Sequence, residues 1–191
     1  MNNAQRLKIL TDSGKTVFSV GDIQSLWQSS ALTTKISLKR MLDKNLVVRL
    51  AKGYYALHEN YNIYELANTI ITPSYISLDS ALFYHQIAFQ VSSRVSSVAL
   101  LNYQKEIQEK TFIYYAMKEP LFFNLAGVEY KNNLAVALPE RAILDGFYFG
   151  LLPNIDNFNK INASFLKELV VYYPDTVKGK LEKLLKTYDT I

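Results

Sequence analysis

The sequence contains no cysteine, and this absence excludes disulfide bonds, thiolate metal sites and thiol catalysis together. It also lacks any run that approaches the roughly 18 apolar residues needed to span a membrane. The first residues alternate between polar and apolar types and do not form the apolar core of a signal peptide. We therefore expect a cytoplasmic protein with no membrane association.

Motifs of common enzymes are also missing. There is no Gly-rich phosphate loop, no GxSxG serine motif and no HExxH zinc motif. The two histidines, His58 and His85, stand without a second His or Cys at metal-ligand spacing. We expect no metal, no cofactor and no catalytic residue, and we do not expect an enzyme.

What the chain does contain is enough apolar residues for a packed core. Of its 191 residues 49% are hydrophobic and 20% are charged, which argues against wholesale disorder, and the length fits one medium domain or a small domain plus a larger one. The 14 tyrosines and 10 phenylalanines could stack on nucleotides. Because many stand within apolar runs, we expect them mainly in cores and interfaces.

Positive charge is concentrated toward the N-terminus. Residues 1–59 hold nine Lys or Arg and four Asp or Glu, a formal charge of +5; the remainder holds twelve and thirteen, a formal charge of −1. Five of the nine cations fall between Lys35 and Arg49. A compact cationic element is what the neutralisation of nucleic-acid phosphates requires, although such clusters are often only solvated faces.

The first sixty residues carry the pattern of three helices followed by a β-hairpin. Apolar spacing predicts helices over 5–13, 20–28 and 32–44, with Ser19 capping the second and Asn45 ending the third in a left-handed conformation. Two β-rich runs, 46–50 and 54–57, flank a glycine-containing tip. This order is typical of a winged helix-turn-helix, whose third helix lies in the major groove of DNA.

Hydroxyl and cationic side chains fall where such a module meets DNA. Those expected on the third helix and its end, and on the hairpin, are Thr33, Thr34, Lys35, Ser37, Lys39, Arg40, Lys44, Arg49 and Lys52. The first five can meet base edges or phosphates, and the last four are expected to bind phosphates. A winged helix that docks only onto another protein is the alternative, and we favour DNA binding.

A short polar segment, 58–62, suggests a boundary between a DNA-binding domain, 1–59, and a second domain, 60–191. In the second domain we expect helices over 63–71, 79–87, 139–149, 163–172 and 176–188, and β-strands over 95–101, 111–117, 127–130 and 133–138. The fold class expected is α+β, an N-terminal winged helix-turn-helix followed by a mixed α/β C-terminal domain.

Charged residues near Pro139 allow two interpretations. Glu140 and Asp145 could form a catalytic carboxylate pair with Arg141 as a clamp. Alternatively, Glu140 caps the start of a helix, while Arg141 and Asp145 form a local i, i+4 pair worth a few tenths of a kcal/mol. We favour the second interpretation.

Three ordered blocks, 49–57 (RLAKGYYAL), 75–82 (YISLDSAL) and 137–145 (ALPERAILD), resemble the AbiEi-type antitoxin family. These proteins are the antitoxins of type IV toxin–antitoxin systems linked to abortive phage infection. The resemblance covers most of the chain; the last forty or so residues match only in being helical and suitably spaced. Asn45 stands where a glycine is common in the family, and Asn tolerates the same left-handed conformation.

The resemblance implies a two-part protein. Its winged helix would bind inverted repeats in its own promoter, as double-stranded DNA, and repress the operon. Its C-terminal domain would counteract a nucleotidyltransferase-type toxin, without requiring a stable complex. The alternative is a stand-alone winged-helix transcriptional regulator whose C-terminal domain senses a ligand or mediates assembly.

Overall fold

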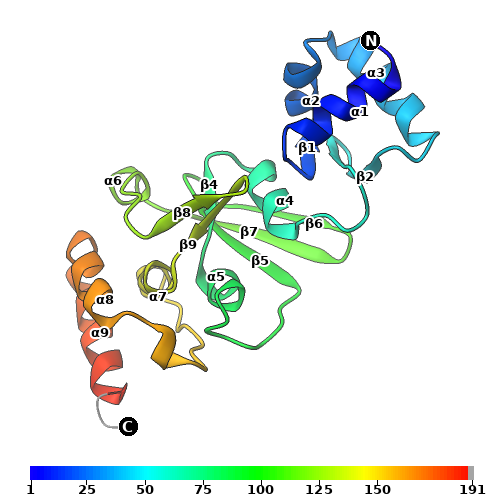
Figure 1. The fold of residues 1–191 in the computed structure, drawn as a ribbon. Coiled ribbons are helices and arrows are strands. Elements are labelled where there is room, and N and C mark those ends of the chain that lie inside the picture. Colours follow the sequence, from blue (N-terminus) through cyan, green and yellow to red (C-terminus); the bar gives the residue numbers. More distant parts are fainter. Residues whose placement is uncertain (189–191) are drawn as a thin grey trace. The chain divides into compact units, whose positions relative to one another are not determined.

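The computed structural model describes residues 1–188 and contains two compact units. The first unit comprises Met1–Thr72 with Lys131–Asn133, and the second comprises Pro73–Tyr130 and the chain from Leu134 onward. The expectation of a mixed α and β protein is confirmed (Figure 1). The sequence suggested a boundary after residue 59, whereas the structure groups residues 60–72 with the first unit; the suggested second domain, 60–191, ends outside the described residues.

The first unit is a helical layer joined to a small antiparallel sheet. Its elements are α1 (Asn3–Asp12), β1 (Val17–Ser19), α2 (Val20–Trp27), α3 (Ala31–Leu42), β2 (Val48–Ala51), β3 (Tyr54–Ala56) and α4 (Ile63–Ile70). The strands pair in the order β1-β3-β2. The predicted three helices and hairpin are present with bounds shifted by one or two residues, and β1 adds a third strand that the sequence showed only as a short apolar piece.

Local capping explains where these helices begin and end. Ser19 accepts a hydrogen bond from the backbone of Asp22 and so caps α2, as predicted; Ser30 caps α3 in the same way. After α3, Asn45 takes the predicted left-handed conformation at φ 52°, and the amide of Leu46 donates back to the Met41 carbonyl. The chain is thereby turned out of α3 and into β2.

An apolar core fixes the orientation of α3. The core residues come from all three helices, β1 and the turn before β2, and they are Leu10, Phe18, Ile23, Trp27, Leu38, Met41 and Val47. Each buried large side chain of this kind stabilises the fold by about 2 kcal/mol. Because Leu38 and Met41 are the contribution of α3, the opposite face of that helix is held toward solvent.

The second unit is built on a mixed six-stranded sheet. Its elements are β4 (Ser74–Ile76), α5 (Leu78–Tyr84), β5 (Arg94–Ala99), β6 (Tyr103–Ile107), β7 (Lys110–Ala116), α6 (Glu119–Phe122), β8 (Val128–Lys131), β9 (Leu134–Ala137), α7 (Pro139–Tyr148), η1 (Phe158–Lys160), α8 (Ala163–Leu169), η2 (Val170–Tyr172) and α9 (Asp175–Tyr188). The strand order is β6-β7-β5-β4-β9-β8, with parallel pairs β4–β9 and β5–β7.

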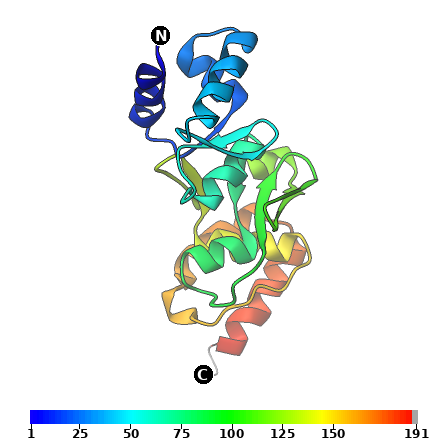
Figure 2. The same ribbon diagram turned by 90° about the vertical axis from the view of Figure 1, so that its right-hand side faces the viewer.

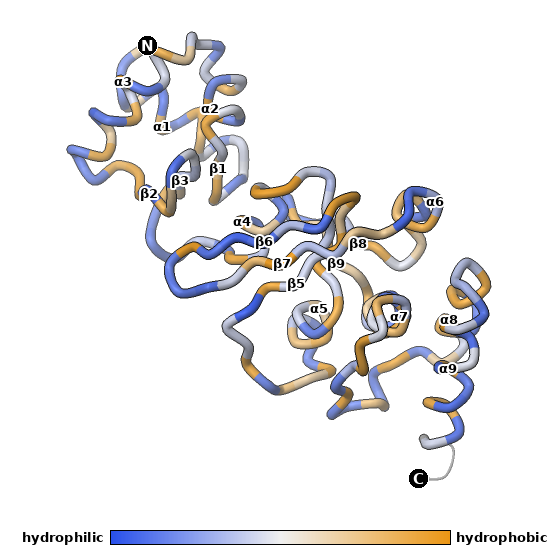
Figure 3. The backbone as a smooth tube through the Cα atoms, turned by 180° about the vertical axis from the view of Figure 1, so that it is seen from behind, coloured by the Kyte–Doolittle hydropathy of each residue, from blue (hydrophilic) through white to orange (hydrophobic). Residues whose placement is uncertain are grey.

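Helices cover one face of this sheet. α5 and α7 lie side by side against it, and α8 and α9 pack on α7 (Figures 1 and 2). Hydrophilic and hydrophobic residues alternate along α5 and α7, as they do along the N-terminal helices (Figure 3), and Leu82 of α5 and Ile143 and Leu144 of α7 are completely buried. The core of the second unit therefore lies between the sheet and the α5–α7 layer.

Two strands of the second unit were not predicted. β6 is an edge strand with sequence YQKEI and is largely exposed, so it has no apolar run to mark it. β4 has only three residues, all buried, and stands directly before a helix. None of the helices within residues 1–188 combines the length and the apolar character that a membrane span requires.

Candidate nucleic-acid interface

Helix α3 has one buried and one exposed face. Thr34, Ser37, Leu38 and Met41 form the buried face. Of the nine residues predicted to contact DNA, seven are exposed: Thr33, Lys35, Lys39, Arg40, Lys44, Arg49 and Lys52. The structure thus brings most of the predicted set to the surface of one unit. Of the residues predicted on α3, Thr34 and Ser37 are buried and the others are exposed.

Thr34 and Ser37 are a correction to the predicted interface. Thr34 is fully buried, and its hydroxyl lies 2.7 Å from that of Ser29 in the turn before α3. Ser37 is buried as well and donates a hydrogen bond to the Thr33 carbonyl one turn earlier. Both hydroxyls therefore form hydrogen bonds within the unit, and neither side chain belongs to the exposed face of α3.

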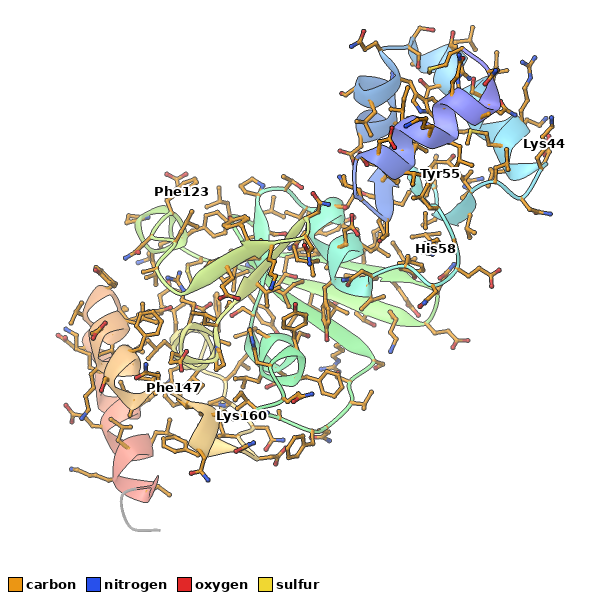
Figure 4. The ribbon with its side chains drawn as sticks, in the orientation of Figure 1. Lys44, Tyr55, His58, Phe123, Phe147 and Lys160 are labelled. Carbon is orange, nitrogen blue, oxygen red and sulfur yellow. The ribbon has the colours of Figure 1, made fainter. Side chains whose placement is uncertain are left out.

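The exposed cations of α3 and its C-terminal turn are Lys35, Lys39, Arg40 and Lys44; we call these four residues the basic face. Lys44 projects outward from its unit, while Tyr55 lies at the centre (Figure 4). Among the described residues, no carboxylate lies within salt-bridge distance of the basic face. Its charges are consequently available to an anionic partner.

Arg6, on α1, is a functional candidate that the sequence analysis missed. A hollow of about 510 Å³ beside α3 is lined by three cations, Arg6, Arg40 and Lys44, together with Asn2 and other residues of both helices. The Arg6 guanidinium lies 5.1 Å from the centre of the Trp27 ring, and its Nε is buried without a hydrogen-bond partner within the described chain. No local motif marks Arg6, because its proximity to α3 arises only on folding.

The β2–β3 hairpin presents the two remaining predicted cations. Arg49 and Lys52 are exposed, and a bulge interrupts the strand pairing between Arg49 and Ala51. Gly53 has φ 91°, and its carbonyl accepts from the amide of Val20 at the start of α2. The hairpin tip is therefore fastened to the helical layer, which gives both cations a defined position.

Two large apolar side chains interrupt the exposed face of α3. Leu32 is 69% exposed and Ile36 is 44% exposed, and they lie one helical turn apart. Ile36 also lines the hollow beside Arg6. The apolar spacing over 32–44 by itself places both with Leu38 and Met41 on the inner face of the helix, and this is wrong, because in the structure Leu38 and Met41 lie in the core and Leu32 and Ile36 do not.

The i, i+4 pair of Arg141 and Asp145 that the sequence analysis favoured is present in α7, but it is buried and not exposed. Arg141 and Asp145 are each 0% exposed, and Arg141 Nε donates to Asp145 Oδ1 at 3.1 Å. Three hydroxyl groups also donate to this carboxylate: Tyr75 at 3.0 Å, Ser77 at 2.7 Å and Tyr173 at 2.6 Å. The pair is therefore the centre of a buried network. Breaking it should cost far more stability than breaking an exposed i, i+4 pair.

The remaining donors of Arg141 hold the segment around α6. Its guanidinium donates to the carbonyls of Leu121, Asn124 and Ala126 at distances between 2.8 and 3.2 Å, and to the Tyr75 hydroxyl at 3.1 Å. Every nitrogen of the guanidinium is bonded, so no donor faces a substrate. This geometry supports a structural role for the cluster.

Burial and charge shift the titration of this network. Burial raises the pKa of Tyr75 and Tyr173 well above the usual range, and the Asp145 charge raises both further. Burial also raises the pKa of Asp145, against the opposing effect of Arg141. For Arg141, burial lowers the pKa, but the charge of Asp145 and the interactions with Tyr75 and Tyr173 together outweigh burial, so the pKa is raised.

Glu140 and His85 have structural partners. Glu140 lies in the first turn of α7, as expected, but its carboxylate accepts a hydrogen bond from the backbone amide of Asn162, the N-cap of α8. His85 Nε2 lies 3.0 Å from the Ala137 carbonyl, and His58 is exposed. Within residues 1–188, no group of three His, Asp or Glu is placed to hold a metal ion.

The second unit contains an open hollow of about 530 Å³, which we call the tyrosine hollow. Its lining residues are Lys118, Pro120, Leu121, Asn124, Tyr148, Tyr172, Tyr173 and Pro174. Tyr173 belongs both to this lining and to the buried network. A ligand in the hollow would therefore touch a group that is hydrogen-bonded to Asp145.

A scan against protein-family models gives no match to this chain, and a search of curated protein sequences gives none either.

Proposed function

We propose that the first unit is a winged helix-turn-helix that binds double-stranded DNA, with α3 in the major groove and the β2–β3 hairpin against the flanking backbone. The observation that carries this proposal is the division of α3. Its apolar face is buried, and the basic face is exposed without acidic partners within the described chain. The element order, with a sheet β1-β3-β2, supports the same assignment.

The biological role we propose is that of a cytoplasmic antitoxin and autorepressor. It binds inverted repeats in its own promoter and counteracts a nucleotidyltransferase-type toxin without needing a stable complex. This role rests on the resemblance of three sequence blocks to AbiEi-type antitoxins. Residues of the second and third blocks, Tyr75 and Ser77 with Arg141 and Asp145, form one buried network, which supports treating the blocks as one structural signature.

Gel shifts on the DNA upstream of the gene, repeated across salt concentrations, test the DNA-binding part. We expect sequence-selective binding that weakens by at least about tenfold in the Lys35→Ala/Lys39→Ala variant, because two exposed cations of α3 are lost. Lys8→Ala is the control, since Lys8 pairs with Asp12 and does not belong to the basic face. Equal affinity of the double variant and the control would contradict the assignment of α3.

The hairpin cations have a different expected signature. Arg49→Ala or Lys52→Ala should weaken selected and random duplexes to the same degree, and should reduce the slope of log affinity against log salt by about 1. A loss confined to the selected duplex would instead make the hairpin a base-reading element.

The tyrosine hollow favours a second candidate function, a stand-alone regulator whose second unit senses a ligand. Co-expression with a nucleotidyltransferase-type toxin separates the two roles. If the protein is an antitoxin, its co-expression restores growth. If the two units act independently, the Lys35→Ala/Lys39→Ala variant restores growth as well. A regulator leaves the toxin active, and its DNA affinity changes with an effector.

A further inference from the structure

The apolar pair on α3 is exposed where burial would be expected. Among the large apolar side chains of residues 1–72, those that are exposed are Met1, Leu32 and Ile36. Two of the three therefore stand one turn apart on a single helix, in the half of α3 that begins at Ala31. Ile36 has no part in the core, although Leu38 and Met41, which follow it in the same helix, are almost completely buried there.

The pair lies between two polar rows. At about 100° per residue, Leu32 and Ile36 occupy the middle of the exposed face. Lys35 and Lys39 run along one side, and Thr33 and Arg40 along the other. A partner of this face must therefore be anionic at its edges and must offer small apolar groups at its centre.

We propose that Leu32 and Ile36 are specificity-determining residues that contact the C5-methyl groups of thymines in the major groove. This inference rests on the proposed DNA binding of α3. The thymine methyl is the apolar group that base pairs present in the major groove, and phosphates border that groove on both sides. The surface has the matching arrangement, with aliphatic side chains at the centre and cations at the rims.

The spacing limits which thymines can be read. Residues four apart begin about 6 Å apart along a helix, and successive bases of one strand are separated by about 3.4 Å. The two side chains therefore reach bases about two steps apart. We expect selected duplexes to carry thymine at two such positions in each half-site.

The test uses the full chain and duplexes selected from a random pool. Each thymine of the selected duplex is replaced singly by deoxyuridine, which removes the methyl group and keeps the base pairing and phosphates. We expect binding to weaken about fourfold at each of two positions, the value of one buried methyl group. Replacement at the remaining thymines should leave the affinity unchanged.

Variants identify the side chains responsible. The Leu32→Ala/Ile36→Ala variant should bind the thymine and deoxyuridine duplexes equally, and its melting temperature should match that of the native chain because both side chains are exposed. Lys39→Ala is the matched control, which should weaken both duplexes while preserving their difference. Together these results would show that the methyl contacts come from the apolar pair.

Three outcomes would overturn the inference in different ways. Selective binding with equal affinity for thymine and deoxyuridine duplexes would remove the methyl contacts and leave the DNA-binding proposal standing. No selective binding to any duplex would remove the DNA-binding proposal, and the inference with it. If the Leu32→Ala/Ile36→Ala variant discriminates between the two duplexes as well as the native chain does, the methyl contacts come from other residues.

Discussion

The two units use charged side chains in opposite ways. On α3 and its C-terminal turn, four cations are exposed and have no acidic partner among the described residues. In α7, one cation and one carboxylate are completely buried, and every donor of Arg141 has an acceptor. Exposed charges without a partner indicate a binding surface, whereas buried charges that are paired and hydrogen-bonded stabilise the fold.

Breaking the buried pair gives the largest expected effect. Arg141→Leu leaves the Asp145 carboxylate buried without its counter-charge, and we expect a loss of about 3–5 kcal/mol in the free energy of unfolding. The matched control is Lys8→Ala, because Lys8 and Asp12 form an i, i+4 pair that is exposed, with side chains 75% and 58% accessible. That control should change stability by less than about 0.5 kcal/mol.

Denaturant unfolding of both variants provides the measurement. Similar small losses for the two variants would mean that burial adds nothing to the α7 pair, and the contrast between the units would disappear. The DNA affinity of a folded Arg141→Leu protein is a second readout, and it should stay unchanged if the second unit supplies no DNA contact.

High pH should unfold the second unit through its tyrosines. In the folded state the pKa of Tyr75 and Tyr173 is raised, so both phenols stay protonated while those of the unfolded chain ionise near pH 10. The unfolded state then binds fewer protons, and stability is lost as pH rises above about 10, by about 1.4 kcal/mol per pH unit for each phenol. Unfolding curves between pH 8 and 11 measure this loss.

The Tyr75→Phe/Tyr173→Phe variant is the control for this alkaline transition. It has no phenol left to titrate in the network, so its stability should decline less steeply above pH 10, although it starts lower because two hydrogen bonds to Asp145 are gone. If the stability of the variant and of the native chain declined equally steeply above pH 10, groups other than Tyr75 and Tyr173 would be responsible for the alkaline transition.

Neighbouring threonines sharpen the comparison within α3 itself. Thr34→Ala removes a buried hydroxyl whose partner is Ser29, and should cost about 1 kcal/mol of stability without altering the salt dependence of DNA binding. Thr33→Ala removes an exposed hydroxyl and should affect DNA affinity more than stability. Thermal unfolding and gel shifts of the two variants measure these effects. A loss of stability in Thr33→Ala together with a loss of DNA affinity in Thr34→Ala would contradict the division of α3 into a buried and an exposed face.

Local signals account for what the sequence could predict. Ser19 and Asn45 carry their own conformational preferences, so the start of α2 and the end of α3 were predicted to within two residues. Pro139 likewise indicated the start of α7, because proline is favoured in the first turn of a helix. Cations placed on α3 could also be predicted as exposed, because Lys and Arg are rarely buried without a partner.

Long-range contacts account for what the sequence could not predict. The burial of Arg141 depends on Tyr75, which is 66 residues away. The proximity of Arg6 to Arg40 depends on how α1 packs. Leu78 takes a left-handed conformation at φ 57° that a leucine does not favour by itself, and such strain is held only by the surrounding fold.

The parallel pairing of β4 with β9 also has a consequence for the order of folding during synthesis. Ile76 pairs with Val136, so the centre of the large sheet cannot close until the ribosome has made the intervening chain. The contacts of α1 to α3 with β1 to β3 join residues within the first sixty, and short loops close faster than long ones. We expect the N-terminal helices and hairpin to form on the nascent chain before the sheet of the second unit is complete.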